Sequence, residues 1–228
     1  MKLSVSMTQK EERWGWLVLA LELLIFPTLL VILNATLPAP LSDAALNFLL
    51  FSVNFIAVLL VFHAFLAASA RRAAAAPFHC LRFAAIGLML YYVGVFLVDL
   101  LIRSVDPQFS NINDSSIHAM AQDHYTLILF GTVFLVPVTE ETLFRGLIFG
   151  RLHRKNRAAA YILSTLIFGL IHITGYLYTA SAEVLFLCFL QYVPAGLCLA
   201  WAYEKSDTIW TPVLMHMTIN QISMSYMR

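Results

Sequence analysis

The stretch LILFGTVFLVPVTEETLFRGLIF (127–149) is apolar over most of its length, yet it carries two glutamates and an arginine. A membrane-spanning helix needs about 20 mostly apolar residues to cross a core of ~30 Å. At the helix centre a charged residue costs about 2.5–3.5 kcal/mol, whereas Leu, Ile, Phe or Val recovers only about 0.3–0.6 kcal/mol. If all three sat at the centre, Glu140, Glu141 and Arg145 would therefore cost roughly 8–10 kcal/mol, whereas the apolar residues of 127–149 recover on the order of 6 kcal/mol. Such charges must face the bundle interior or water, and ionisable groups at membrane depth indicate a functional site.

The composition of the whole chain predicts an integral membrane protein. Of its 228 residues, 61% are hydrophobic and only 12% are charged, whereas soluble domains are about half apolar and about 25% charged. About 15 mixed-charge residues precede the first apolar run, which favours a retained span over a cleaved signal peptide. We expect an all-α, polytopic transmembrane helical bundle, a single domain over 1–228 with about seven to eight spans. Seven segments are long and apolar enough: 16–34, 46–69, 83–102, 125–150, 158–179, 183–203 and 208–227.

The loop charges predict an orientation in the cell membrane. Basic residues gather between spans two and three and between spans four and five, and the positive-inside rule places both loops in the cytoplasm. The N-terminus would then also be cytoplasmic. The polar connection 103–124 holds three aspartates against one arginine, which suits the outside. A half-length or interfacial helix within it, around SSIHAMAQ (115–122), would supply an eighth element. With a net charge of +1 and no Lys/Arg run, nothing suggests nucleic-acid binding.

Helical spacing assigns different surroundings to the three charges of the fourth span. Glu141 and Arg145 are four residues apart, which stacks a carboxylate beside a guanidinium. Glu140 is turned about 100° from Glu141, so its carboxylate stays free for acid–base chemistry. Pro137 frees a backbone carbonyl one turn earlier. The alternative is a charge cluster sited at the cytoplasmic interface, where insertion is cheaper.

Two further spans each carry a pair of site-like residues at helical spacing. Phe168 and His172 are four apart in the fifth span, and His216 and Asn220 are four apart in the seventh. A lone histidine in a span is more often a packing group, but three spans that contribute polar groups to one interior favour a shared site. At 1.5 Å per residue, Glu140, His172 and His216 lie about 15, 20 and 13 Å from the cytoplasmic ends of their spans. One intramembrane cavity is therefore geometrically possible.

This set of side chains suits hydrolysis of a peptide bond. A carboxylate and an imidazole can hold and deprotonate a water, while an imidazole N–H and an amide N–H can stabilise an oxyanion. We expect no cofactor. A zinc site formed by Glu140, His172 and His216 is the competing hypothesis, because histidine and carboxylate also suit zinc. The sequence lacks the HExxH motif of zinc proteases, as well as the GxSG of rhomboids and the GxGD of presenilins.

Together EETLFR (140–145), FGLIH (168–172) and HMTIN (216–220) resemble, in order and spacing, the EExxxR, FxxxH and HxxxN/D motifs of the CAAX prenyl protease and bacteriocin-processing family, also called CPBP or Abi. The resemblance covers about 81 residues. It implies an intramembrane glutamic protease of about eight helices whose catalytic core is 125–227. In it Glu140 and His172 would activate water, and His216 and Asn220 would form the oxyanion hole. Glu141, Arg145 and Phe168 would support the site.

Other readings of the sequence stay open. A catalytically inactive membrane scaffold or immunity protein would keep the same fold, and a transporter is disfavoured because no repeat relates the two halves. We expect the partners to be the lipid bilayer and a peptide or membrane-protein substrate. Cys80, Cys188 and Cys198 are expected to be structural thiols. Glu22, inside the first span, is left without a role.

Overall fold

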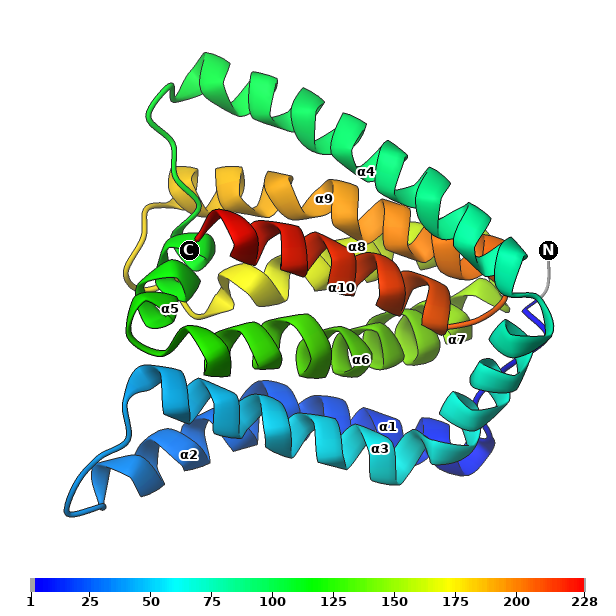
Figure 1. The fold of residues 1–228 in the computed structure, drawn as a ribbon, viewed down its shortest axis with the longest axis horizontal. Coiled ribbons are helices and arrows are strands. Elements are labelled where there is room, and N and C mark those ends of the chain that lie inside the picture. The colour runs from blue at the N-terminus through cyan, green and yellow to red at the C-terminus, as the bar shows by residue number, and fades with distance from the viewer. Residues whose placement is uncertain (1–2, 228) are drawn as a thin grey trace.

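Residues 3–227 are described by a computed structural model, which contains no β-strand in that range. Over these residues the chain folds into ten α-helices, several of which join through π-helical turns into longer continuous helices (Figure 1). Their bounds are α1 (Gln9–Ala20), η1 (Leu21–Ile25), α2 (Phe26–Ala35), α3 (Asp43–Ala75), α4 (Pro77–Val105), α5 (Ile112–Phe130), η2 (Gly131–Leu135), α6 (Val136–Glu140), η3 (Glu141–Phe149), α7 (Gly150–His153), α8 (Arg157–Thr174), α9 (Ala182–Ser206) and α10 (Trp210–Tyr226).

Within the described residues, six continuous helices are long and apolar enough to cross a membrane: Gln9–Ala35, Asp43–Ala75, Pro77–Val105, Ile112–His153, Arg157–Thr174 and Ala182–Ser206. Each overlaps one of the first six predicted spans. The seventh predicted span corresponds to α10, whose 17 residues fall slightly short of the usual spanning length. The predicted all-α polytopic bundle is confirmed. The fifth span ends at Thr174, earlier than predicted, because residues 175–179 form turns.

Helix ends follow the capping chemistry of the sequence. Side chains at the N-caps accept hydrogen bonds from the first backbone N–H groups of their helices, which the helix itself cannot satisfy. The capping residues are Thr8, Ser42, Asn111, Asn156 and Ser181. At the other end of α9, Asp207 takes a left-handed conformation, with a φ of 57°, and terminates the helix.

A short helix precedes the fourth span, as the sequence predicted. Helix α5 begins at Ile112, bends at His124, where φ is −140° and ψ is 58°, and then continues into the span. Its first part contains residues 115–122. The connection from 103 to 124 is therefore largely helical.

The loops predicted to share one side of the membrane lie at the same end of the bundle. Figure 1 shows the first turn of α1 at the same end of the bundle as the junction of α3 and α4 and as α7, whereas the last turn of α10 lies at the opposite end, beside α5. Arg151 of α7 forms an ion pair with Glu12 of α1 at 2.6 Å. Arg72 of α3 forms another with Asp207 at 3.2 Å. The spatial grouping of basic loops thus agrees with the charge pattern.

The segment that carries the two glutamates lies in the interior of the bundle. All nine residues of η3 are buried, and helices α8 and α9 pack against it. Helix α10 packs on α4, α6 and α9. These contacts bring the fourth span, α8 and α10 together, although α6 ends at Glu140 and α10 begins only at Trp210.

Candidate active site

The fourth span departs from α-helical geometry around Pro137. In the π-helical turn η2 the Val136 N–H donates to the Gly131 carbonyl, and Pro137 has no N–H. The Thr132 carbonyl is therefore left without a partner from its own helix. The Nδ2 of Asn220, on α10, donates to it at 2.8 Å. The carbonyl that the sequence predicted to be freed thus helps to position a predicted site residue.

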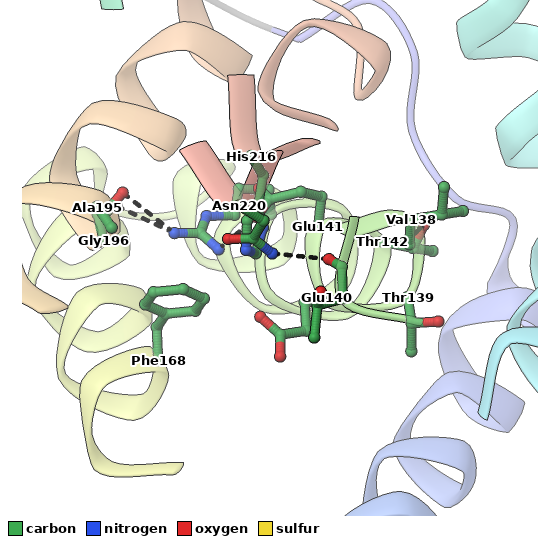
Figure 2. Close-up of polar contacts among 12 residues, drawn as sticks. Val138, Thr139, Glu140, Glu141, Thr142, Phe168, Ala195, Gly196, His216 and Asn220 are labelled. Atoms are coloured by element: carbon green, nitrogen blue, oxygen red, sulfur yellow. Dashed lines mark hydrogen bonds and ion pairs between the residues drawn. The ribbon is translucent and has the colours of Figure 1, made fainter. Parts of the chain in front are cut away.

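A second π-helical segment, η3, begins directly after Glu140. Single π-turns within α-helices are frequent at functional sites, because the wider turn changes the direction of the side chains. Figure 2 shows Glu140 and Glu141 leaving the same helix toward different sides. Glu141 extends toward His216, while the carboxylate of Glu140 lies apart from it. The separation of the two glutamates predicted from helical spacing is present in the structure.

Glu141 and Arg145 form a fully buried ion pair. The Arg145 Nη1 donates to Glu141 Oε1 at 2.9 Å, and both side chains have 0% exposure. Arg145 Nη2 points to the backbone carbonyls of Ala195 and Gly196 in α9, at 3.4 and 3.5 Å. A buried charge is tolerated only when it is paired and hydrogen-bonded. The predicted pairing at four-residue spacing is present.

Phe168 contacts both the ion pair and a candidate catalytic histidine. Its ring centroid lies 4.2 Å from Arg145 Cζ, a cation–π distance. The same ring lies 4.6 Å from the imidazole of His172. The Phe168 carbonyl also accepts a hydrogen bond from His172 Nδ1 at 2.8 Å. Phe168 therefore orients the two groups that the sequence pattern placed around it.

His216 is held by Glu141. Its Nδ1 lies 2.9 Å from Glu141 Oε1, so the same oxygen accepts from Arg145 and from the imidazole. Because Nδ1 must carry a proton to donate, the other ring nitrogen, Nε2, is left for chemistry. Glu141 is thus a positioning residue for His216 as well as the partner of Arg145.

Glu140 faces His172. The Nε2 of His172 lies 3.9 Å from Glu140 Oε2, beyond hydrogen-bond distance. Because Nδ1 of His172 donates to the Phe168 carbonyl, Nε2 carries a lone pair in the neutral ring. Glu140 Oε2 is buried and has no hydrogen-bond partner among the described residues. A separation of this size between two acceptors suits one bridging water.

The four predicted catalytic residues meet at one cavity of about 310 Å³. Glu140, His172, His216 and Asn220 all line it. The wall also includes residues outside the predicted 125–227 core, notably Phe51, Tyr91 and Asp114. Tyr192 of α9 lines it too and stacks on His172, with centroids 4.2 Å apart. Tyr192 was not predicted from the sequence, because no helical spacing relates it to a motif.

The described residues do not fit the alternative zinc site. Within 3–227, no three His, Cys, Asp or Glu side chains are grouped so that they could hold a metal ion.

Two ionisable residues outside the three motifs, Glu22 and His153, interact with glutamates of the bundle. Glu22 lies in η1, where its Oε2 is buried without a hydrogen-bond partner among the described residues, and it interacts electrostatically with Glu140. His153 lies 2.8 Å from Glu204 on α9. The sequence signal that could have marked Glu22 as a site neighbour was its charge inside an apolar span.

Comparison with known proteins supports the resemblance. Residues 122–222 match the family described as Type II CAAX prenyl endopeptidase Rce1-like. The chain is 32% identical over 95 residues to the "Putative membrane peptidase YdiL" of Bacillus subtilis, a match that covers 41% of this chain and 34% of that protein. It is 29% identical over 86 residues to the UPF0177 protein YxdF of Lactococcus lactis, covering 38% of this chain and 42% of that protein. No solved structure matches. The predicted family resemblance is confirmed, and the four cavity residues fall inside the matched segment.

Proposed function

We propose, from the premise that residues 122–222 are an Rce1-like segment of a multi-pass membrane protein, that this chain is an intramembrane endopeptidase. The observation that carries the proposal is the convergence of Glu140, His172, His216 and Asn220 on one cavity. Its substrate is a peptide or membrane protein whose scissile bond reaches this cavity. The loop charges favour a cytoplasmic N-terminus.

Hydrolysis begins with a water held between Glu140 and His172. The lone pair on His172 Nε2 accepts one proton of this water and the Glu140 carboxylate accepts the other. Transfer of one proton to this pair makes the water oxygen nucleophilic, and it attacks the carbonyl carbon of the peptide bond. The same pair then returns the proton to the departing amine, so the protons balance.

The oxyanion of the tetrahedral intermediate is stabilised from α10. Asn220 donates one amide hydrogen to Thr132 and has a second hydrogen free for the oxyanion. His216 can donate from Nε2 only when both ring nitrogens are protonated, because Nδ1–H already donates to Glu141. The Glu141 carboxylate stabilises the imidazolium that this role requires. Pre-oriented donors of this kind supply about 2.7–4 kcal/mol each in other hydrolases.

The proposed mechanism needs no metal, because the four cavity side chains supply both the base and the donors. Glu140 and His172 act on water, while His216 is turned to Glu141 and serves as a donor. The inactive scaffold or immunity protein remains the competing function. The biological phenotype would require Glu140 if the protein is a protease, and would not require it if the protein is a scaffold.

The test compares membrane proteomes and new peptide termini in cells that carry wild-type protein, Glu140→Gln or His172→Ala. Both substitutions should abolish substrate cleavage while the protein remains inserted. Asp99→Asn is a matched control, because Asp99 pairs with Arg103 outside the cavity, and it should retain cleavage. Cleavage by Glu140→Gln at the wild-type rate would rule out the mechanism, and a phenotype unchanged by this substitution would favour the scaffold. Stoichiometric zinc in purified active protein, with reversible loss of activity on chelation, would rule out the metal-free form.

A further inference from the structure

The cavity has an acidic wall. Its lining residues include two carboxylates, Glu140 and Asp114, and two imidazoles, and no lysine or arginine from the described part of the chain. Arg145 lies nearby but is fully buried and committed to Glu141 and to backbone carbonyls of α9. A bound peptide would therefore meet negative charge that no protein cation offsets.

Asp114 is held at the edge of this cavity by its helix. The side-chain oxygen of Asn111, the N-cap of α5, accepts from the backbone N–H groups of Asn113 and Asp114 at 2.9 and 3.4 Å. The Asn111 amide also donates to Gln191 Oε1 on α9 at 2.7 Å. Both Asn111 and Gln191 line the cavity. The first turn of α5 is thus tied to the cavity wall.

The carboxylate of Asp114 is available to a ligand. Asp114 is exposed, and it forms no ion pair with a lysine or arginine within residues 3–227. It is within electrostatic range of His172, a candidate catalytic residue. Its place in the first turn of α5 also lets it interact favourably with the helix dipole. That interaction accounts for an acid at this position but not for its lying on the cavity wall.

We propose that Asp114 selects peptide substrates that carry a lysine or arginine side chain close to the scissile bond. This inference rests on the proposed protease function and names the substrate class of the same site. A carboxylate on the cavity wall attracts a cationic side chain and repels an acidic one. Asp114 acts as a specificity residue in substrate binding, and Glu140 and His172 perform the chemistry.

The test uses the full-length protein in lipid nanodiscs and short apolar peptides, acetylated and amidated, that differ at one position as Lys, Gln or Glu. Wild-type protein should cleave the Lys peptide about three- to tenfold more efficiently than the Gln peptide, chiefly through KM, and the Glu peptide least. Asp114→Asn should lower the Lys-to-Glu ratio at least threefold, leaving only the contribution of Glu140, and Asp114→Lys should lower it further. Asp99→Asn, outside the cavity, should keep the wild-type ratio.

Binding of the same peptides to Glu140→Gln protein gives a readout that is independent of cleavage. The Lys peptide should bind tighter than the Glu peptide, and Asp114→Asn should remove the difference. Equal affinities for all three peptides, or an unchanged ratio in Asp114→Asn, would overturn the proposal even if cleavage is observed. If the wild-type protein bound the peptides with this charge preference but cleaved none of them, the protease function would be overturned instead. The same peptides are also tested with a free N-terminus. If the preference appears only with these peptides, the recognised cation is the α-amino group, which would contradict the side-chain proposal.

Discussion

The Nδ1 of His216 lies 2.9 Å from the Oε1 of Glu141, the same oxygen that accepts from Arg145. One buried carboxylate thus connects a structural cation to a candidate catalytic imidazole. Glu141 cannot be altered without affecting both, so its contribution to folding and its contribution to the site must be separated by paired substitutions.

Glu141→Gln should destabilise the protein by about 3–5 kcal/mol, because it leaves the buried guanidinium of Arg145 without a counter-charge. Replacing both members, as Glu141→Leu with Arg145→Met, should recover most of this loss, since an apolar pair of similar volume has no charge to desolvate. The double variant should remain inactive, because His216 has lost its acceptor. Unfolding in mild detergent and a cleavage assay together check this. A double variant no more stable than Glu141→Gln would contradict the argument.

Asn220→Leu should cost about 1–3 kcal/mol of stability, because it leaves the Thr132 carbonyl without its hydrogen-bond donor. The cost should be smaller in a Pro137→Ala background, where residue 137 regains an N–H that can pair with the helix carbonyls. Measuring both single variants and the double variant gives the coupling between the two sites. Cleavage should be lost in both backgrounds, since the free amide hydrogen is gone in each. Strict additivity would show that Pro137 does not determine the state of this carbonyl.

The spans and the three site motifs were predictable because their signals are local. Apolar length predicts a membrane helix, and four-residue spacing predicts that Glu141 meets Arg145 and that Phe168 meets His172. Other features depend on packing between helices and were not predicted. The link from His216 to Glu141 joins residues 75 positions apart, and Asn220 finds the Thr132 carbonyl only because α10 packs beside the fourth span. The π-helical geometry of 141–149 and the place of Asp114 on the cavity wall likewise follow from tertiary contacts.

His216→Gln should retain part of the cleavage activity, whereas His216→Leu should abolish it. The glutamine side chain keeps an N–H donor that can reach the oxyanion, and leucine has none. Loss of one pre-oriented donor lowers kcat about 100- to 1,000-fold in other hydrolases, and a fall of that size is expected for the leucine variant. Single-turnover rates of both variants on one peptide check this, and equal rates would contradict the role assigned to His216.

Gly196→Ala should destabilise the packing of α8 on α9 by about 1–3 kcal/mol. A Cβ at this position would lie 2.6 Å from Thr165 Cγ2 and 3.0 Å from Thr165 Cα, and the backbone atom cannot move aside cheaply. The shift would also displace the carbonyl that Arg145 approaches, so cleavage should fall along with stability. Gly175→Ala is the matched control, because a Cβ there meets no atom within 4 Å, and it should leave both nearly unchanged. Thermal unfolding and cleavage of the two variants compare them directly. If the two variants had the same thermal stability and the same cleavage rate, the close approach of α8 and α9 would not be what positions Arg145.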